Sequence, residues 1–376
     1  MYLNFYVQKG LLLKRIRDWD VRLGLTAITI ALVIGTSAMA KIRTWNYRVF
    51  YYLHVVLSLS LLPVLYLHVS HLRIYILEAG AVYVLNNVSR ESSRATADAT
   101  IELLPQTNLL SITTPLTDIL SSKTYTPGQH VYLGFPTLPP KLRINPFSIA
   151  NPHPTSDNRI HLIARTLSGT TAKLSHLAKQ PQPVPLTIEG PYGSARHFPK
   201  LDTYDRILLV AGGVGATFTL PIYIDLLQRA TPGKRVPPVR FIWTVRDGYD
   251  AQWGIDQLRA QLGKLPELEL YVSRTEAEMQ DGVMRREEAD QTIELRQQEQ
   301  SQDRTKGVDA DLENVAKEGR PDLKTIVDEI FQVNANERVA VLVCGPTGMG
   351  KSLRREVGRW VARGRDVFWH TEEFGW

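Results

Sequence analysis

The 376-residue chain has a single cysteine, Cys344. One cysteine excludes a disulfide framework and any zinc or iron–sulfur site built from clustered cysteines. The net charge is only +6. Basic flanks around membrane segments account for such a charge, and no RNA- or DNA-binding signature accompanies it, so no nucleic acid is expected as a partner. The apolar stretch Met1–Leu13 lacks a basic n-region and a clear cleavage site, so it does not predict a secretory signal.

Apolar residues are concentrated near the N-terminus. Leu23–Ala40 is an 18-residue stretch without a charge, and Val49–Val69 is a 21-residue stretch interrupted by two histidines and Pro63. At about 1.5 Å per residue these stretches reach roughly 27 and 31 Å, about the thickness of a bilayer core, so both are predicted to span a membrane. A third stretch, Ile74–Val88, carries Glu78. It is predicted to span as well, with an interfacial helix as the alternative.

The orientation of these segments depends on their flanking charges. The link Lys41–Arg48 carries three positive charges, which favours the cytoplasmic side. The stretch before Leu23 is also basic, so this rule alone leaves the orientation open. If the link is cytoplasmic, the chain leaves the cytosol by the second span and returns by the third. Everything after Arg90 then lies in the cytosol.

His54 and His68 lie 14 residues apart within the second stretch. Fourteen helical steps fall roughly 40° short of four turns, so both rings leave one face, separated by roughly 21 Å along the axis. This geometry suits two stacked haems, each taking one axial imidazole, whereas two interfacial histidines are the alternative. His71 does not repeat the pair. We therefore expect the opposing ligands to come from a partner subunit, or the chain to be an N-terminally shortened version of something longer.

The second part of the chain predicts two further domains. From about Thr100, short alternating strands separated by turn residues predict an antiparallel β-barrel that ends near Ile188–Gly193. From Arg206, apolar strands alternate with helices, which predicts a doubly wound parallel α/β sheet. The predicted domains are 1–93 (α-helical, transmembrane), 94–195 (barrel) and 196–376 (α/β). A polar run at about 276–324 is expected to be a disordered insertion, with a regulatory loop as the alternative.

The expected elements can be stated by residue range. The barrel strands are expected at 101–104, 109–113, 130–135 and 160–165. The parallel strands are expected at 207–211, 239–245, 268–272 and 339–343, with helices from the first glycine turn to Leu227 and over Leu353–Ala362.

Two glycine-rich turns follow apolar strands of the predicted sheet. Gly212-Gly213-Val214-Gly215 is placed between a strand and a helix, where the backbone can approach a pyrophosphate. Gly345–Ser352 matches the G-x-x-x-x-G-K-[ST] phosphate loop. A phosphate-loop ATPase also needs a later carboxylate-bearing strand for magnesium, and only 24 residues follow Ser352. A P-loop NTPase is therefore a remote alternative.

In this order the patterns resemble the fungal ferric reductase transmembrane family of the NADPH oxidase superfamily, whose soluble half resembles ferredoxin–NADP reductase. The chain resembles it from roughly Gly24 to Trp376, without the spans that precede them in the family. The resemblance implies that His54 and His68 ligate haem b irons. The flavin motif His-Pro-Phe-Ser/Thr stands as Asn145, Pro146, Phe147, Ser148 and Ile149, with Asn145 departing from the usual histidine. Gly169, Thr170 and Thr171 resemble the turn that receives the FAD pyrophosphate.

The resemblance also implies the residues that bind NADPH. The first glycine turn corresponds to Gly212, Gly213, Gly215 and Thr217, and the second-strand signature ends at Arg246. Ser273 and Arg274 resemble the pair that binds the 2′-phosphate, although Arg274 can equally be read as a surface arginine. Cys344, Gly345, Pro346 and Met349 match the Cys-Gly-Pro motif near the nicotinamide. Trp376 resembles the terminal aromatic that stacks on flavin, with a packing aromatic as the alternative.

The implied activity is a membrane reductase that moves electrons from NADPH through FAD and two haems to an extracellular ferric or cupric chelate. Cys344, Ser148 and Trp376 are the expected catalytic residues. The implied location is the plasma membrane, with a cytosolic C-terminal half. Two alternatives remain: a superoxide-forming NADPH oxidase, and a truncated chain without transmembrane electron transfer.

Overall fold

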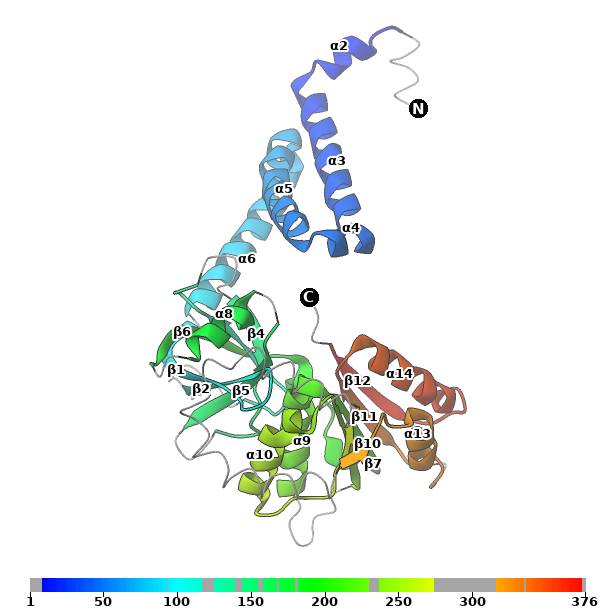
Figure 1. The fold of residues 1–376 in the computed structure, drawn as a ribbon. Helices are drawn as coiled ribbons and strands as arrows, with labels where there is room; N and C mark the ends of the chain where they lie inside the picture. Colours follow the sequence, from blue (N-terminus) through cyan, green and yellow to red (C-terminus); the bar gives the residue numbers. More distant parts are fainter. Residues whose placement is uncertain are drawn as a thin grey trace. The chain divides into compact units, whose positions relative to one another are not determined.

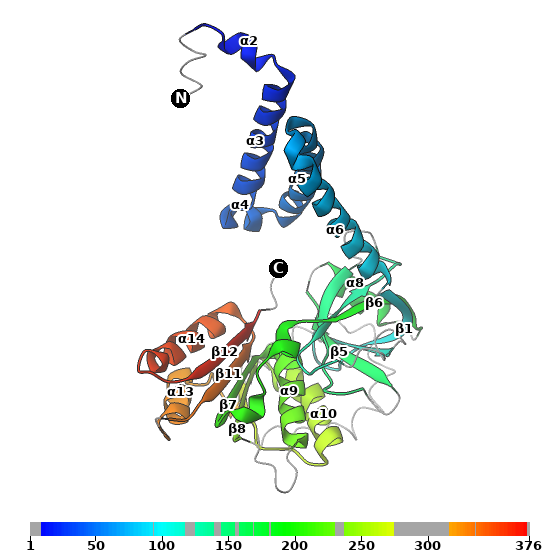
Figure 2. The same ribbon diagram turned by 180° about the vertical axis from the view of Figure 1, so that it is seen from behind.

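The computed structural model describes residues 9–92, 94–116, 125–138, 144–154, 158–167, 169–179, 182–229, 237–273, 316–334 and 336–373. The chain divides into two compact units, Met1–Ser92 and Ser93–Trp376. They are called unit 1 and unit 2 below, and each is described by itself (Figures 1 and 2).

Unit 1 is entirely helical in its described part. Its elements are α2 (Leu12–Ile16), α3 (Trp19–Ser37), α4 (Ala40–Trp45), α5 (Tyr47–His68), η1 (Ser70–Leu72) and α6 (Arg73–Ser92). Two of them, α3 and α5, are long and apolar enough to cross a membrane, which agrees with the first two predicted spans. The α6 helix does not meet that criterion, so the third predicted span is not confirmed.

Helices α3 and α5 lie side by side, joined through α4 (Figure 1). The Asn46 side chain accepts a hydrogen bond from the Val49 N–H and so fixes the start of α5. The only buried side chains of α3 are Leu23, Ala27 and Ser37. Most other large apolar side chains of the two helices are exposed, as expected where the surrounding solvent is lipid rather than water.

The first sheet of unit 2 is a nearly closed antiparallel barrel. Its strands are β1 (Arg94–Leu103), β2 (Leu109–Pro115), β3 (His130–Gly134), β4 (Ile144–Ser148), β5 (Arg159–Arg165) and β6 (Val184–Tyr192), with α8 (Thr170–Leu177) between β5 and β6. Their order is β4-β3-β6-β1-β2-β5. An isolated bridge from Ile149 to Leu162 connects the two edge strands. The prediction of a barrel is confirmed, but β4 and the whole of β6 were not predicted as strands.

The second sheet is parallel and six-stranded, in the order β10-β9-β8-β7-β11-β12. Its strands are β7 (Arg206–Gly212), β8 (Val239–Val245), β9 (Glu269–Val272), β10 (Ala316–Glu318), β11 (Val339–Cys344) and β12 (Val367–Glu372). Its helices are α9 (Ala216–Gln228), α10 (Gln252–Leu262), α13 (Leu323–Phe331) and α14 (Thr347–Val361). Apolar side chains of α9 and α10 bury one face, and those of α13 and α14 bury the other. The predicted doubly wound sheet is confirmed.

The predicted disordered insertion at about 276–324 was wrong at its C-terminal end. Strand β10 and the start of α13 lie inside that range. Ala316–Glu318 pairs in parallel with β9. The Asp322 side chain caps α13 because it accepts hydrogen bonds from the backbone N–H groups of Lys324 and Thr325. Residues 276–315 of the range lie outside the described residues.

Within unit 2 the barrel packs against the helices of the parallel sheet. The Gln257 side chain of α10 donates to the Ala150 carbonyl at 2.7 Å. Arg165 of β5 pairs with Asp250 at 3.4 Å. A small apolar cluster also joins the two sheets. It consists of Leu109, Ala150 and Ile163 of the barrel, packed against Val214 in the first glycine turn and Trp253 of α10. These contacts bring the barrel to the side of the sheet on which the first glycine turn lies.

Candidate functional site

The two predicted glycine turns lie next to each other at the carboxyl edge of the parallel sheet. Strand β7 ends at Gly212, and Gly213–Gly215 forms the short 3-10 helix η5 before α9. The neighbouring strand β11 ends at Cys344, which is followed by Gly345 and Pro346. The carboxyl edge of such a sheet is where ligands of this fold bind.

The two turns are in backbone contact. A Cβ on Gly215 would lie 2.2 Å from the Cys344 carbonyl oxygen, and a Cβ on Gly212 would lie 2.6 Å from Cδ of Pro346. A Cβ on Gly345 would lie 2.6 Å from Cε of Met349. These glycines are therefore required by space. The structure brings together the predicted residues Gly212, Gly215, Cys344, Gly345, Pro346 and Met349.

Gly213 differs from these glycines because it faces open space. Its φ is +54°, and a Cβ there would meet no protein atom within 4 Å. No side chain caps the N-terminus of α9 among the described residues. The predicted contact residue Thr217 is instead internal: it is 1% exposed, and its hydroxyl donates to the Val214 carbonyl at 2.9 Å. The open face of the turn is thus backbone, which suits a pyrophosphate.

Two further residues predicted to bind NADPH, Arg246 and Ser273, lie at the same edge. Arg246 follows β8 and is exposed, whereas Ser273 follows β9. Both the N–H and the hydroxyl of Ser273 donate to the Val245 carbonyl, at 3.0 and 3.1 Å. Ser273 is therefore fixed beside the residue that precedes Arg246. Arg274 lies outside the described residues, and so does Trp376.

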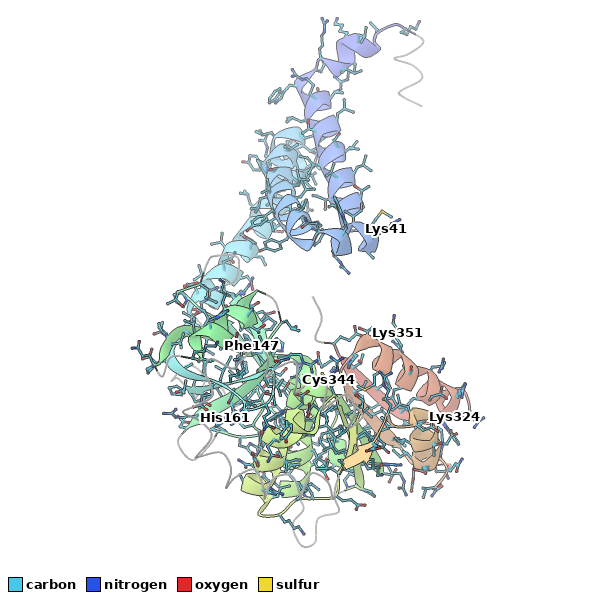
Figure 3. The ribbon with its side chains drawn as sticks, viewed as in Figure 1. Lys41, Phe147, His161, Lys324, Cys344 and Lys351 are labelled. Carbon is cyan, nitrogen blue, oxygen red and sulfur yellow. The ribbon has the colours of Figure 1, made fainter. Side chains whose placement is uncertain are left out.

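Cys344 is fully buried beneath the second turn (Figure 3). Burial raises the pKa of its thiol, and the carboxylate of Glu372, its register partner on β12, raises that pKa further. The thiol is therefore neutral at physiological pH. A neutral thiol offers a compact, weakly polar surface, and it is not positioned to act as a thiolate nucleophile.

Glu372 and two histidines lie close to the predicted cofactor residues in the pairing of the strands. His370 Nε2 lies 3.0 Å from Oε1 of Glu372. Burial lowers the pKa of His130 on β3, and Glu372 partly opposes that shift. His130 is the register partner of Ser148, so it lies on the strand next to the flavin motif. The sequence analysis missed Glu372 and His130, since only strand pairing places Glu372 opposite Cys344 and His130 opposite Ser148.

The predicted flavin residues divide between the two faces of β4. Phe147 (labelled in Figure 3) is 7% exposed and packs in the barrel core with Ile149. Pro146 and Ser148 alternate to the other face, opposite Tyr132 and His130 of β3. Phe147 therefore supports the strand from inside, and the outward surface is formed by its neighbours.

Asn145 connects the flavin motif to the predicted pyrophosphate turn. Its Nδ2 donates to Oγ1 of Thr170 at 2.9 Å. Gly169, with φ +77°, precedes α8, and Thr170 and Thr171 form the helix's first turn. The Thr171 hydroxyl accepts from the Leu167 N–H, and no side chain caps this N-terminus among the described residues. The predicted turn is thus a helix N-terminus, a site suited to phosphate.

His54 and His68 both lie on α5, as predicted. The Nδ1 atom of each ring is buried without a hydrogen-bond partner in the part of the chain that the structure describes. The His68 ring packs against Gly24 of α3, where a Cβ would lie 2.9 Å from Cε1 and 3.0 Å from Nε2. Phe50 lies against His54, with ring centroids 5.1 Å apart. Unpartnered imidazoles in an apolar helix are costly, so these residues fit the role of axial ligands.

The phosphate-loop pattern at Gly345–Ser352 does not form a phosphate loop. Helix α14 already begins at Thr347, and the N–H groups of Met349 and Gly350 donate to the Pro346 carbonyl. A phosphate loop needs these backbone donors free for the ligand. The structure therefore gives no support to a P-loop NTPase.

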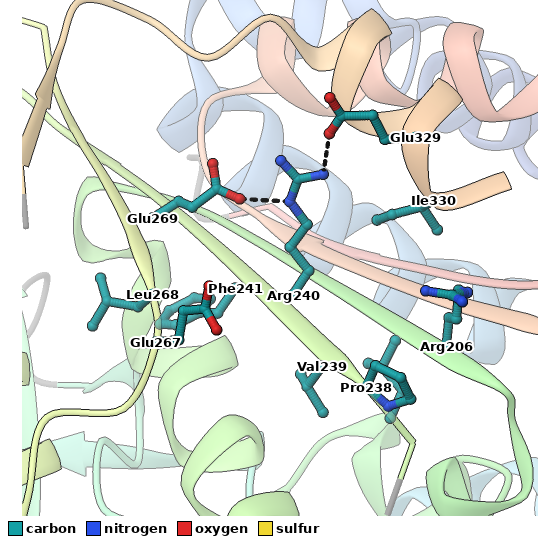
Figure 4. Close-up of a pocket in the computed structure, with 11 residues that line it drawn as sticks. Arg206, Pro238, Val239, Arg240, Phe241, Glu267, Leu268, Glu269, Glu329 and Ile330 are labelled. Carbon is teal, nitrogen blue, oxygen red and sulfur yellow. Dashed lines mark hydrogen bonds and ion pairs between the residues drawn. The ribbon is translucent and has the colours of Figure 1, made fainter. Parts of the chain in front are cut away.

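A cavity of about 420 Å³ lies at the opposite, amino edge of the parallel sheet (Figure 4). At its centre Arg240 donates to Glu269 at 2.5 Å and to Glu329 at 2.7 Å. Lys317 of β10 binds Glu269 at 2.8 Å. Burial opposes ionisation, but the hydrogen bonds from Arg240 and Lys317 prevail and lower the pKa of Glu269 to about 2. The network joins β8, β9, β10 and α13, and its side chains are engaged with one another, so its role is structural.

A helical unit, a barrel and a doubly wound sheet with open backbone turns define a membrane-associated flavin- and nicotinamide-binding protein. Three family models match the chain in succession: a ferric reductase like transmembrane component over residues 1–65, an FAD-binding domain over 93–196, and a ferric reductase NAD binding domain over 204–358. The chain belongs to the ferric reductase family.

Individual relatives agree with this assignment. The chain is 23% identical to a protein of Scheffersomyces stipitis named probable metalloreductase, over 99% of this chain and 69% of that one. It is 21% identical to ferric/cupric reductase transmembrane component 2 of Schizosaccharomyces pombe, over 92% of this chain and 66% of that one. It is 30% identical to NADPH oxidase 4 of Rattus norvegicus, over 50% of this chain and 30% of that one. The chain thus spans about two thirds of the first two relatives and less of the third.

Proposed function

We propose that the chain is a membrane reductase that transfers electrons from NADPH, through FAD and haem, to a ferric or cupric chelate. The observation that carries the proposal is the pair of unpartnered ring nitrogens on His54 and His68. They lie on a candidate membrane span of the same chain that carries the flavin and nicotinamide modules. Binding of FAD and NADPH does not require buried imidazoles in an apolar helix, whereas axial ligation of haem does.

The carboxyl edge of the parallel sheet would bind NADPH. The backbone at Gly213 and the uncapped N-terminus of α9 suit its pyrophosphate, because helix N-termini carry partial positive charge. Arg246, beside Ser273, supplies positive charge for the 2′-phosphate. Arg274 remains a prediction for the same phosphate. The Gly345–Pro346 turn, supported from below by the buried neutral thiol of Cys344, would form the floor beneath the nicotinamide.

The outer face of β4 would bind FAD. Pro146 and Ser148 would line the flavin ring, and the uncapped start of α8 at Gly169–Thr171 suits the pyrophosphate. Bound FAD supplies the conversion from a two-electron donor to single-electron steps. Contacts between Gln257 and Ala150 and between Arg165 and Asp250 hold the barrel against the parallel sheet, which supports a direct approach of the two cofactors.

His54 and His68 would hold haem b through their imidazoles, and haem supplies a one-electron path through the bilayer. The described residues contain no second pair spaced like this one, and the opposing ligands would come from a partner subunit. A cytosolic link at Lys41–Arg48, together with a third crossing by α6, would place unit 2 on the cytosolic side of the plasma membrane.

Membranes from cells that produce the chain test this function. Wild type should reduce a ferric chelate with NADPH under anaerobic conditions and show a reduced haem spectrum. His54→Ala and His68→Ala should each lose most of that activity and part of the spectrum, whereas the control His71→Ala should retain both. Unchanged chelate reduction in both histidine variants would refute the electron path.

The rival acceptor is dioxygen, which is favoured by the likeness to an NADPH oxidase. Activity that requires oxygen and yields superoxide, with no anaerobic chelate reduction, would establish the rival. A flavin-only spectrum would instead indicate a chain without transmembrane electron transfer.

A further inference from the structure

Trp243 on β8 contacts the first glycine turn from inside the sheet domain. Its side chain is fully buried, yet its indole Nε1–H donates to the Gly213 carbonyl at 3.0 Å. A buried indole N–H normally finds a partner, and here the partner is the one glycine of the turn whose Cβ position faces open space.

The indole is held in place on several sides. A Cβ on Gly254 of α10 would lie 2.6 Å from Cη2 of Trp243, so the glycine makes room for the ring. Trp253 packs edge-on with ring centroids 5.6 Å apart, and Phe241 lies nearly parallel at 6.3 Å. Because the ring has no space to rotate, the direction of its N–H is fixed as well.

The hydrogen bond in turn fixes the peptide that follows Gly213. The same carbonyl accepts the N–H of Ala216, so it receives two donors while φ of Gly213 stands at +54°. In a planar trans peptide the carbonyl and the next N–H point in opposite directions. The Val214 N–H therefore points away from Trp243.

We propose that Trp243 is a positioning residue for NADPH: it holds the Gly213–Val214 peptide so that the turn presents its backbone to the pyrophosphate. This inference rests on the proposed function. A turn that is already ordered loses less conformational entropy when the dinucleotide binds, so the hydrogen bond strengthens binding without touching the ligand.

The matched pair Trp243→Phe and Trp253→Phe tests the proposal in the full chain, purified in detergent. Each substitution keeps an aromatic ring and removes one indole N–H. The Nε1 of Trp253 has no hydrogen-bond partner among the described residues, so its loss controls for ring size. Titration with NADP⁺ should show about a fivefold higher Kd for Trp243→Phe, the usual effect of one hydrogen bond. Trp253→Phe should bind like wild type.

Kinetics separate positioning from a general loss of structure. Trp243→Phe should raise the KM for NADPH while kcat at saturation, FAD content and Tm stay near wild type. Equal Kd values for Trp243→Phe and wild type, or equal changes in both variants, would overturn the proposal.

If Trp243→Phe does not fold, Gly254→Ala keeps the indole but displaces it. Gly254→Ala should then raise the Kd, and an unchanged Kd would overturn the proposal. Failure of wild type to bind NADP⁺ would count against the proposed function instead.

Discussion

The two units of the chain use apolar residues in opposite ways. On α3 and α5, Leu32 is 63% exposed and Val56 is 59% exposed. In unit 2, Leu209 of β7 and Trp243 of β8 are completely buried. Unit 2 therefore completes its own core, whereas unit 1 directs its apolar surface outward. The hydrophobic effect stabilises the first arrangement only in water and the second only in a bilayer.

Replacement of one apolar side chain by a carboxylate should give the largest effects, on folding in unit 2 and on membrane insertion in unit 1. Leu209→Asp places a carboxylate in the centre of the sheet core, which should cost about 4 kcal/mol or more and abolish FAD retention. Val56→Asp leaves unit 2 folded but should cost about 2.5 to 3.5 kcal/mol in membrane insertion. FAD content of purified protein and resistance to carbonate extraction measure the two effects.

Val56→Leu is the control for the membrane variant and should behave as wild type. The comparison between the units fails if Val56→Asp inserts normally, because that face of α5 would then not be in lipid.

A smaller effect should follow from the contact between α3 and α5. Leucine at position 24 would overlap the His68 ring, since even a Cβ lies 2.9 Å from it. Gly24→Leu should therefore lose the haem absorbance that depends on His68 while it keeps that of His54. Gly35→Leu on the same helix is the matched control, because a Cβ there meets no atom within 4 Å. An unchanged haem-to-protein ratio in Gly24→Leu would contradict the packing.

The smallest effect concerns the charged network in unit 2. Arg240→Ala removes two carboxylate hydrogen bonds and should lower the free energy of unfolding by about 2 kcal/mol at pH 7. The pKa of Glu269 is about 2 in the folded chain, below its ordinary value of 4.5. Its stabilising contribution is therefore complete above pH 4.5 and disappears as the pH falls toward 2.

Denaturation at several pH values measures this effect. The gap in stability between wild type and Arg240→Ala should narrow between pH 4.5 and 2. The control Arg338→Ala breaks an exposed pair with Asp366 and should change stability much less. A gap that stays constant with pH would mean that Glu269 is not held by Arg240.

The sequence was most informative where one local pattern decides the structure. Uncharged stretches predicted α3 and α5, and predominantly apolar runs predicted β7, β8 and β11. Glycines after those runs located both turns. Strand β4 was missed because its motif contains Pro146, and β10 was missed because Ala316–Glu318 has no apolar pattern and is ordered by pairing with β9.

The rest of the site depends on contacts between distant residues. Nothing near Glu372 in the sequence shows that it opposes Cys344, since that pairing follows from the register of β11 and β12. Thr217 has the residue type of a phosphate ligand, yet its hydroxyl is used inside the turn. Phe147 alternates into the barrel core because neighbouring residues of a strand face opposite sides.

The close approach of Gly215 to the Cys344 carbonyl also bears on how this protein can change. No side chain of any size fits between the two turns, so neither can be remodelled while the other stays as it is. Efforts to alter coenzyme preference should therefore leave the contact between the two turns intact. They should instead change Arg246 and Ser273, which follow strands β8 and β9. Over evolutionary time, Gly215 should be replaced by a larger residue only in chains in which both turns have shifted.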